Sequence, residues 1–308
     1  MLKGKKMKIV FMGTPEYATA ILRALFENNF KISAVFTQPD KPVGRKQILT
    51  PPDVKKFLLE SHADTPIFQP SNIKTPEIAK KIGEFSPDFI VVAAYGQILP
   101  LEILEICPCI NLHASILPKF RGASPIQSAI LEGEKISGVT AMKMGAGLDD
   151  GDILGFSFCG IQKLDESEVF HKFGNVAAKL CIKILQNFDD IAPLKQKNVL
   201  SSKCKKIKKT DGLVKFSDSA DEILAKFSAF KTWPGIFLEN GTKLLEIRKF
   251  SDEKKEFGKI SHITKDGFTL AVKDGEIEIL KLQEPSKKAI LARDFINGKR
   301  LKIGDRIS

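Results

Sequence analysis

The sequence predicts an α/β domain built on a parallel sheet, followed by a smaller domain with the strand pattern of an OB-like β-barrel. Up to about residue 190, short apolar runs alternate with helix-like segments, a pattern typical of a parallel sheet covered by helices on both faces. After the lysine-rich stretch SSKCKKIKKTDG at 201–212, one helix pattern precedes short strands punctuated by glycine turns. We therefore expect two domains of different architecture.

Five apolar runs supply the strands expected in the first domain. In chain order they are KIVFMG at 8–13, ISAVFTQ at 32–38, FIVVAAYG at 89–96, CINLHAS at 109–115 and GVTAMKM at 138–144. Helix-like segments at 17–28 and 126–132 lie between them. Apolar runs without polar alternation predict strands that are buried on both faces, as in a parallel sheet.

The second domain is expected to follow the lysine-rich stretch. SADEILAKFSAF at 219–230 predicts a helix, and TWPG at 232–235 ends it with a turn. The short runs that follow are separated by ENG, KDG and INGKR, which favour turns between strands.

Length and composition limit the class of protein. The chain has 308 residues, 43% of them hydrophobic, and no apolar run long enough to span a membrane, so we expect a soluble protein of about two domains. Met1 to Lys6 are interpreted as a frayed extension or an upstream start before Met7, because no signal-peptide cleavage site follows. Five cysteines without a pairing pattern favour a reducing cytoplasm. Cys107 and Cys109 lack a second pair at zinc spacing, so we expect no metal site.

The positive charge is concentrated in the last third of the chain. Residues 201–308 contain 24 Lys and Arg against 16 Asp and Glu, whereas residues 1–200 contain 24 against 21. A net charge of +8 on a small domain favours a polyanionic partner, since Lys and Arg neutralise phosphates and release counterions. A basic surface that only keeps the protein in solution explains the same charge, so both interpretations stay open here.

Three polar stretches follow expected strands. They are GTPEYA at 13–18, AYGQILP at 94–100 and NLHASILP at 111–118. Ligands of open parallel sheets bind beyond the carboxyl ends of the strands, so these stretches should line one cleft. The first turn lacks G-x-G-x-x-G, and no G-x-x-x-x-G-K-[ST] occurs, which argues against a dinucleotide site and against the usual nucleotide triphosphatase.

Asn111 and His113 are two positions apart, so on a strand they project from the same face. A glycine-rich stretch, MGAGLDDGDILG at 144–155, adds Asp149, Asp150 and Asp152. Its spacing does not fit an EF-hand calcium loop. This stretch is either a solvated turn or the source of one carboxylate that meets His113 across the cleft.

An Asn, a His and an Asp suit the attack of an amine on a carbonyl carbon. Asn111 and a protonated His113 can donate hydrogen bonds to the developing oxyanion, while Asp149 favours the charged imidazole and helps to remove the proton of the amine. No covalent nucleophile is needed. Ser115 as a nucleophile is the competing idea, but HASIL lacks the G-x-S-x-G elbow.

NLHASILPKFRGASPIQ at 111–127 and GLDDGDIL at 147–154 resemble the formyltransferase family that uses 10-formyltetrahydrofolate, whose hallmark is N-x-H-x-S-x-L-P followed by L-D-x-G. FMGTPEYA, TQPDKPVGR, VVAAYGQILP, TWPG and LQEPSKKAI are similar to the members of that family that formylate methionyl initiator tRNA. The similarity extends over nearly the whole chain from Met7.

The resemblance implies a Rossmann-like formyltransferase domain at 1–200, a basic linker at 201–210 and a C-terminal tRNA-binding β-barrel domain at 211–308. It implies transfer of the formyl group of 10-formyltetrahydrofolate, which is released as tetrahydrofolate, to the α-amine of methionyl initiator tRNA for translation initiation. With it we expect a cytoplasmic monomer that uses no metal and no membrane.

The resemblance also assigns roles to the positions that match the family. Asn111, His113 and Asp149 match its catalytic residues. The folate-binding positions are matched by Ser115, Ile116, Leu117, Pro118, Gly96, Gln97, Ile98 and Leu99. Contacts with tRNA are expected from basic residues of the loop 38–55 and of the linker, namely Lys41, Arg45, Lys46, Lys203, Lys205, Lys206, Lys208 and Lys209. In this loop GRKQIL stands where the family commonly has G-R-G.

Two other classes of function remain open on the sequence alone. A formyltransferase of the same fold could act on an amino-sugar nucleotide or on another small amine such as glycinamide ribonucleotide, although the basic C-terminal module argues against the latter. A non-enzymatic RNA-binding protein could have kept the fold, although the intact set of Asn111, His113 and Asp149 argues against it. The lysines of the linker could likewise belong to a solvated connector.

Overall fold

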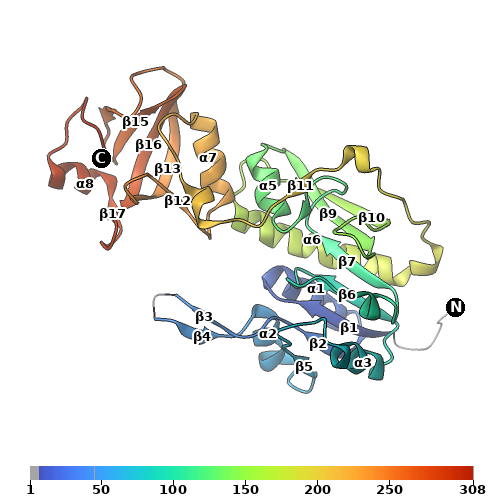
Figure 1. The fold of residues 1–308 in the computed structure, drawn as a ribbon. Coiled ribbons are helices and arrows are strands. Elements are labelled where there is room, and N and C mark those ends of the chain that lie inside the picture. The colour runs from blue at the N-terminus through green and yellow to red at the C-terminus, as the bar shows by residue number, and fades with distance from the viewer. Residues whose placement is uncertain (1–6, 45, 308) are drawn as a thin grey trace. The chain divides into compact units, whose positions relative to one another are not determined.

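The computed structural model describes residues 7–44 and 46–307 (Figure 1). The stretch Met1 to Lys6, interpreted above as an extension, lies outside the described residues. The chain divides into two compact units. The first contains the residues up to 125, 135–161 and 169–205, and the second contains 126–134, 162–168 and the residues from 206 onward. Within the described residues, no helix is long and apolar enough to cross a membrane.

A seven-stranded sheet lies at the centre of the first unit (Figure 1). From one edge to the other its strands are β10 (Ile153–Gly160), β9 (Ile136–Lys143), β7 (Cys109–His113), β6 (Phe89–Ala93), β1 (Lys8–Gly13), β2 (Lys31–Phe36) and β5 (Ile67–Phe68). The strands from β7 to β5 pair in parallel. Their carboxyl ends therefore meet at one edge of the sheet, as the sequence predicted.

β9 runs antiparallel to β7 on one side and to β10 on the other. The run at 138–144 is thus a strand, as expected, but its prediction as a parallel strand is wrong. β9 is an inner strand that is buried along nearly its whole length. An unbroken apolar run reports burial on both faces, and it does not report the direction of the strand.

Apolar side chains of the central strands form the core of the first unit. Met12, Phe36, Ile90 and Val92 belong to one buried cluster, and the first three of them are fully inaccessible to solvent. Burying a side chain of this size stabilises the fold by roughly 1.5–3 kcal/mol. The cluster therefore fixes the strands whose carboxyl ends carry the candidate site.

Helices follow or separate these strands. They are α1 (Glu16–Glu27), α2 (Asp53–Ser61), α3 (Pro76–Glu84), α4 (Leu101–Leu104), α5 (Pro125–Leu131) and α6 (Glu166–Gln186), with 3₁₀ turns at Phe188–Asp190, Asn198–Leu200 and Lys209–Gly212. α1 and α5 agree with the helices predicted at 17–28 and 126–132. Gly13 lets β1 turn directly into α1, because a Cβ there would lie 2.5 Å from that of Ala18.

The stretch 38–55 contains a β-hairpin where the sequence predicted a long loop. β3 (Lys41–Val43) pairs antiparallel with β4 (Ile48–Thr50), and α2 begins soon afterwards. Gly44 and Gln47 have φ angles of +71° and +50°, the left-handed conformation that tight turns need. Strands of three residues are too short to show an alternating pattern, so the sequence could not indicate them.

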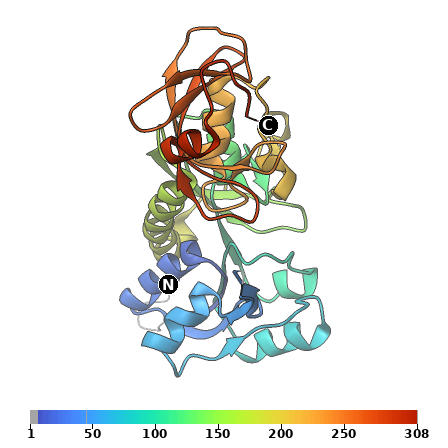
Figure 2. The ribbon, with the colours of Figure 1, turned by 90° about the vertical axis from the view of Figure 1, so that its left-hand side faces the viewer.

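The second unit contains a six-stranded antiparallel sheet (Figure 2). Its strands are β12 (Ile236–Phe237), β13 (Lys243–Ser251), β16 (Gly275–Gln283), β15 (Phe268–Val272), β14 (Ile260–Ile263) and β17 (Ile290–Leu291), the last of which pairs with β16. α7 (Ala220–Ala229) contacts β13, and α8 (Ala292–Lys299) contacts β16. The predicted fold class, a mostly parallel α/β sheet with a separate smaller β domain, is confirmed.

Candidate active site

Asn111 and His113 lie at the carboxyl end of β7, an inner strand of the sheet. The side chain of His113 is buried, with 6% of its surface exposed. Both residues contact the carboxylate of Asp149, which confirms that their spacing places them on one face of the strand. Between them, the carbonyl of Leu112 accepts a hydrogen bond of 2.8 Å from the hydroxyl of Tyr17, which anchors this end of the strand.

Asp149 contacts both polar side chains of β7. Its Oδ1 accepts a hydrogen bond of 3.4 Å from Asn111 Nδ2, and its Oδ2 lies 3.7 Å from His113 Nδ1. Oδ2 also accepts a hydrogen bond of 2.9 Å from the backbone N–H of Gly122. Among the described residues, it is Asp149, and not Asp150 or Asp152, whose carboxylate contacts His113.

The glycine-rich stretch that carries Asp149 is a tightly packed turn. Asp149 itself has a φ of +49°, a left-handed conformation that is unfavourable for a residue with a side chain. A Cβ on Gly147 would overlap the carboxylate of Asp150, and a Cβ on Gly151 would overlap the carbonyl of Lys143. These glycines therefore allow the chain to approach itself closely, so that the turn presents Asp149 to His113.

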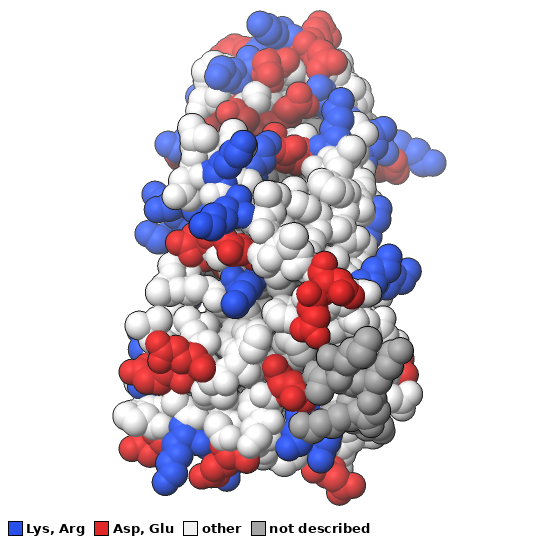
Figure 3. Space-filling view, turned by 90° about the vertical axis from the view of Figure 1, so that its right-hand side faces the viewer, with Lys and Arg blue, Asp and Glu red and all other residues white. Residues whose placement is uncertain are grey.

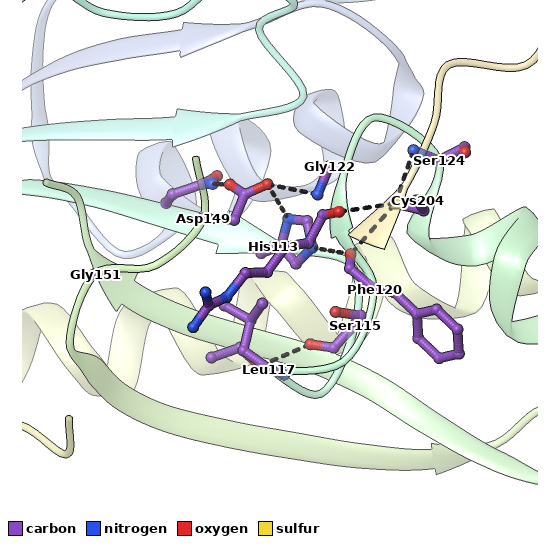
Figure 4. Close-up of polar contacts among 12 residues, drawn as sticks. His113, Ser115, Leu117, Phe120, Gly122, Ser124, Asp149, Gly151 and Cys204 are labelled. Carbon is purple, nitrogen blue, oxygen red and sulfur yellow. Dashed lines mark hydrogen bonds and ion pairs between the residues drawn. The ribbon is translucent and has the colours of Figure 1, made fainter. Parts of the chain in front are cut away.

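Both ring nitrogens of His113 face oxygen atoms. Nε2 lies 2.9 Å from the carbonyl oxygen of Phe120, and Nδ1 faces the carboxylate of Asp149 (Figure 4). A neutral imidazole carries one N–H, so it would leave a ring lone pair directed at an acceptor. The imidazolium carries an N–H at both positions. The geometry therefore suits the protonated His113 that the sequence-based mechanism requires.

The loop that contains Phe120 and Gly122 is fastened by the start of the predicted linker. β8 (Arg121–Gly122) pairs in parallel with β11 (Lys203–Cys204). The hydroxyl of Ser202 accepts a hydrogen bond of 2.9 Å from the backbone N–H of Phe120. A Cβ on Gly122, whose φ is +125°, would overlap the carbonyl of Cys204. Phe120 and Gly122, which contact His113 and Asp149, are therefore positioned by a segment about 80 positions later in the chain.

The sequence did not predict this contact between the linker and the loop of Phe120 and Gly122. Because Lys dominates their composition, residues 201–210 were interpreted as a basic linker whose lysines contact tRNA or belong to a solvated connector. Ser202 and Cys204 contribute one hydroxyl and one backbone strand, neither of which has a sequence pattern of its own. Pairing between segments this far apart in sequence has no local signal.

The predicted folate-binding residues occupy two stretches beyond the ends of β6 and β7. Ser115, Leu117 and Leu99 have buried side chains, and Ser115 Oγ donates to the carbonyl of Lys119 at 2.6 Å. Such residues can offer a ligand backbone groups rather than side chains. Ile98 differs from them, because 64% of its surface is exposed.

Gly96 and Gln97 define the backbone of the first of these stretches. Gly96 has a φ of +89°, and Gln97 is fixed by hydrogen bonds with the backbone of Ile73 and Pro70. A Cβ on Gly96 would lie 3.8 Å from the side chain of Gln38. Among the residues that the structure describes, three buried polar atoms have no hydrogen-bond partner: Gln38 Nε2, Thr37 Oγ1 and the hydroxyl of Tyr95.

The described residues among those predicted to bind tRNA are exposed. They are Lys41, Lys46, Lys203, Lys205, Lys206, Lys208 and Lys209, whereas Arg45 lies outside the described residues. Lys41 lies in β3 and Lys46 in the turn of the hairpin. On the face of the molecule that Figure 3 shows, Lys and Arg are interspersed with Asp and Glu. A mixed face of this kind offers no broad positive surface for phosphates.

Cys107 and Cys109 do not offer reactive thiolates. Burial raises the pKa of the Cys107 thiol to about 11 and that of the Cys109 thiol to about 12. Both thiols are therefore protonated at neutral pH. Among the described residues, no group of three or more His, Cys, Asp or Glu side chains is placed to hold a metal ion.

Comparison with known families gives matches along most of the chain. Residues 7–183 match the family described as "Formyl transferase", and residues 206–300 match "Formyl transferase, C-terminal domain". The "Methionyl-tRNA formyltransferase" of Campylobacter hominis is 99% identical over 98% of this chain and 100% of its own length. The protein of that name from Campylobacter fetus is 56% identical over 97% of this chain and 98% of its own length.

Solved structures of low sequence identity share the fold. A sugar 3N-formyl transferase, WlaRD, determined in the presence of dTDP and 5-N-formyl-THF, has a TM-score of 0.67 and 21% identity, over 92% of this chain and 100% of that one. A methionyl-tRNA formyltransferase from Clostridium thermocellum has a TM-score of 0.56 and 20% identity, over 79% of this chain and 94% of that one.

Proposed function

The chain belongs to the formyl transferase family and, within it, to the methionyl-tRNA formyltransferases, and on this premise we propose how its residues carry out formyl transfer. The enzyme transfers a formyl group to methionyl-tRNA. The relatives at 99% and 56% identity favour this acceptor over an amino-sugar nucleotide, since the sugar enzyme is only 21% identical. The observation that carries the proposed site is the carboxylate of Asp149, which contacts both Asn111 and His113.

The proposed formyl donor is 10-formyltetrahydrofolate, held by Ser115 to Pro118 and by Gly96 to Leu99. The unpartnered Nε2 of Gln38, close to Gly96, fits this assignment, because a buried amide without a partner is costly unless a ligand supplies an acceptor. The ring of a folate is rich in such acceptors. The sugar 3N-formyl transferase of similar fold was determined with 5-N-formyl-THF, which supports a folate donor in this fold.

In the proposed reaction the α-amine of methionine attacks the formyl carbon, the bond from that carbon to N10 of the folate breaks, and the proton lost by the amine is gained by tetrahydrofolate. Asn111 stabilises the oxyanion, because its amide has two N–H groups and Asp149 accepts only one of them. His113 Nδ1 is the second donor. At 3.7 Å from Asp149 its N–H lies beyond a normal hydrogen bond and can turn to a nearer oxyanion.

Asp149 acts on the charge of His113 and on the proton of the amine. Its carboxylate stabilises the imidazolium of His113 and assists the departure of the proton from the amine, directly or through water. The N–H of Gly122 orients this carboxylate. No residue of the chain forms a covalent bond with the formyl group in this scheme.

The partner that we propose is methionyl initiator tRNA, bound by a cytoplasmic monomer. Lys41, Arg45 and Lys46 would contact its phosphates from the hairpin, and Lys203, Lys205, Lys206, Lys208 and Lys209 would do so from the linker. The domain assignment follows the sequence prediction: a catalytic domain at 1–200, a linker at 201–210 and a tRNA-binding domain at 211–308. Exposure of the described lysines supports these contacts.

A competition between acceptors tests the proposed substrate. The protein is incubated with 10-formyltetrahydrofolate and, in separate reactions, charged initiator tRNA, charged elongator methionine tRNA and free amino sugars. We expect the formyl group on the methionine of the initiator tRNA. Equal formylation of the elongator tRNA would contradict the proposed partner, and formylation of an amino sugar alone would contradict the assigned acceptor.

A further inference from the structure

The side chain of Gln196 joins the two loops that hold the catalytic residues. Its Nε2 donates hydrogen bonds to the backbone carbonyls of Asp149, at 2.9 Å, and of Gly151, at 2.8 Å. Its Oε1 accepts from Arg121 Nε at 3.0 Å and from Arg121 Nη2 at 2.7 Å. One amide thus makes four hydrogen bonds and connects the turn of Asp149 with the loop of Arg121.

Each end of this connection leads to a group that contacts the catalytic pair. Asp149 carries the catalytic carboxylate itself. Arg121 stands between Phe120, whose carbonyl faces His113 Nε2, and Gly122, whose N–H donates to Asp149 Oδ2. A change in the position of Gln196 would therefore disturb both partners of the His113–Asp149 contact.

Arg121 shows why the residue at 196 is an amide and not a carboxylate. Its guanidinium is buried, and among the described residues it forms no ion pair. It donates instead to the amide oxygens of Gln196 and Asn198. A Glu at 196 would give the buried charge a stronger partner, but it could not donate to the carbonyls of Asp149 and Gly151.

The backbone of Asp149 needs such a partner. Its φ of +49° is a left-handed conformation that is unfavourable for a residue with a side chain. Gln196 Nε2 donates to the backbone carbonyls of this residue and of Gly151 in the same turn. They hold the conformation in which the carboxylate meets Asn111 and His113.

We propose that Gln196 is a positioning residue for formyl transfer: through its bonds to Asp149, Gly151 and Arg121 it sets the geometry of the His113–Asp149 contact. It touches neither substrate in this scheme. The proposal rests on the catalytic roles assigned above, so its test has to separate a failure of those roles from a failure of Gln196.

Gln196→Glu is the first variant, because it keeps an acceptor for Arg121 and replaces the donating amide group with a carboxylate oxygen, which cannot donate to the carbonyls of Asp149 and Gly151. The transfer rate is measured at saturating substrates, together with KM for 10-formyltetrahydrofolate and for methionyl initiator tRNA. We expect kcat to fall about 10- to 100-fold, the loss typical of a catalytic group displaced by about 1 Å, with both KM values nearly unchanged. Gln186→Glu, the same change at an exposed position in α6, is the matched control and should leave kcat unchanged.

The same substitution is then made in an Asp149→Asn background under single-turnover conditions. Residues that act through one another are non-additive, so Gln196→Glu should add little to the loss caused by Asp149→Asn. An equal additional loss in both backgrounds, or an unchanged kcat for Gln196→Glu alone, would overturn the positioning role. If Asp149→Asn itself were fully active, the assigned catalytic role of Asp149 would fail instead.

Thermal unfolding of each variant separates positioning from stability. Should Gln196→Glu not fold, Gln196→Asn keeps the amide but is one methylene too short to reach both loops. We expect the Gln196→Asn enzyme to fold and to have a lower kcat, with both KM values nearly unchanged. A Gln196→Asn enzyme with full kcat would contradict the proposal.

Discussion

At the scale of single residues, the site depends on one carboxylate. The sequence placed Asn111 and His113 on one face of a strand, since the alternation of a β-strand is independent of the rest of the fold. Spacing could not choose between Asp149, Asp150 and Asp152. That choice follows from the left-handed backbone of Asp149, which is set by contacts with Gln196 and thus by tertiary structure.

Asp149→Asn should lose most of the transfer rate, about 100-fold or more at saturating substrates. The amide keeps the size of the side chain, but it no longer balances the imidazolium of His113. Steady-state kinetics at neutral pH measure the effect. Asp150→Asn, at the exposed neighbouring position, is the control and should retain the parental rate. The reverse pattern would move the catalytic role to Asp150.

At the scale of secondary structure, the positions of the main strands could be predicted from local sequence patterns, whereas strand direction and long-range pairing could not. Buried runs gave the strands, because continuous burial selects continuous apolar sequence. The same runs could not give the direction of β9, because continuous burial does not depend on strand direction. The pairing of β8 with β11 has no local signal, because the two segments are about 80 positions apart. The hairpin of β3 and β4 could not be predicted, because strands of three residues are too short to show an alternating pattern.

Gly122→Ala should weaken both the fold and the catalytic loop. The new Cβ would overlap the carbonyl of Cys204, and the φ of +125° is strained for any residue but glycine. We expect a loss of stability of about 1–3 kcal/mol and a lower kcat, because the N–H of this residue orients Asp149. Urea unfolding and kinetics provide the two measurements.

The control for this variant is Gly83→Ala in α3. A Cβ there would meet nothing within 4 Å, and the position lies in a helix, where Ala is favoured over Gly. It should leave kcat unchanged and leave stability equal or slightly higher. An equal loss in the two variants would show that Gly122 has no special role.

Lys41→Ala combined with Lys46→Ala tests the hairpin as a tRNA contact. Both lysines are exposed, so their removal should not disturb the core. We expect KM for methionyl initiator tRNA to rise several-fold, with KM for 10-formyltetrahydrofolate unchanged. Lys74→Ala with Lys80→Ala, two exposed lysines outside the proposed surface, is the control. A rise confined to KM for the folate would contradict the assignment.

At the scale of the whole molecule, most of the net positive charge lies in the part of the chain that forms the antiparallel sheet. Residues 201–308 have a net charge of +8, and from residue 206 onward they belong to the unit with the antiparallel sheet. The proposed catalytic residues lie in the unit with the mostly parallel sheet. Composition could suggest a polyanionic partner, but it could not name one. The acceptor follows from the family, and individual tRNA contacts depend on side-chain positions that charge counting cannot give.

Salt should therefore affect the two substrates differently. Raising the ionic strength should weaken binding of methionyl initiator tRNA steeply, because each phosphate contact releases counterions, while folate binding should change little. Filter binding of tRNA and fluorescence titration of the folate over the same salt series measure both. Salt insensitivity of tRNA binding would exclude the basic C-terminal domain as its main anchor.

The most direct test of the proposed site is the single-turnover rate of His113→Ala, measured together with its Kd for methionyl initiator tRNA. The proposed roles predict a rate that is lower by about 100- to 1000-fold or more, since an oxyanion donor is lost, with a Kd close to that of the unsubstituted enzyme. His171→Ala, at an exposed position in α6, is the control. An active His113→Ala enzyme, or a loss of rate that is explained by an equal loss of tRNA affinity, would contradict the catalytic role of His113.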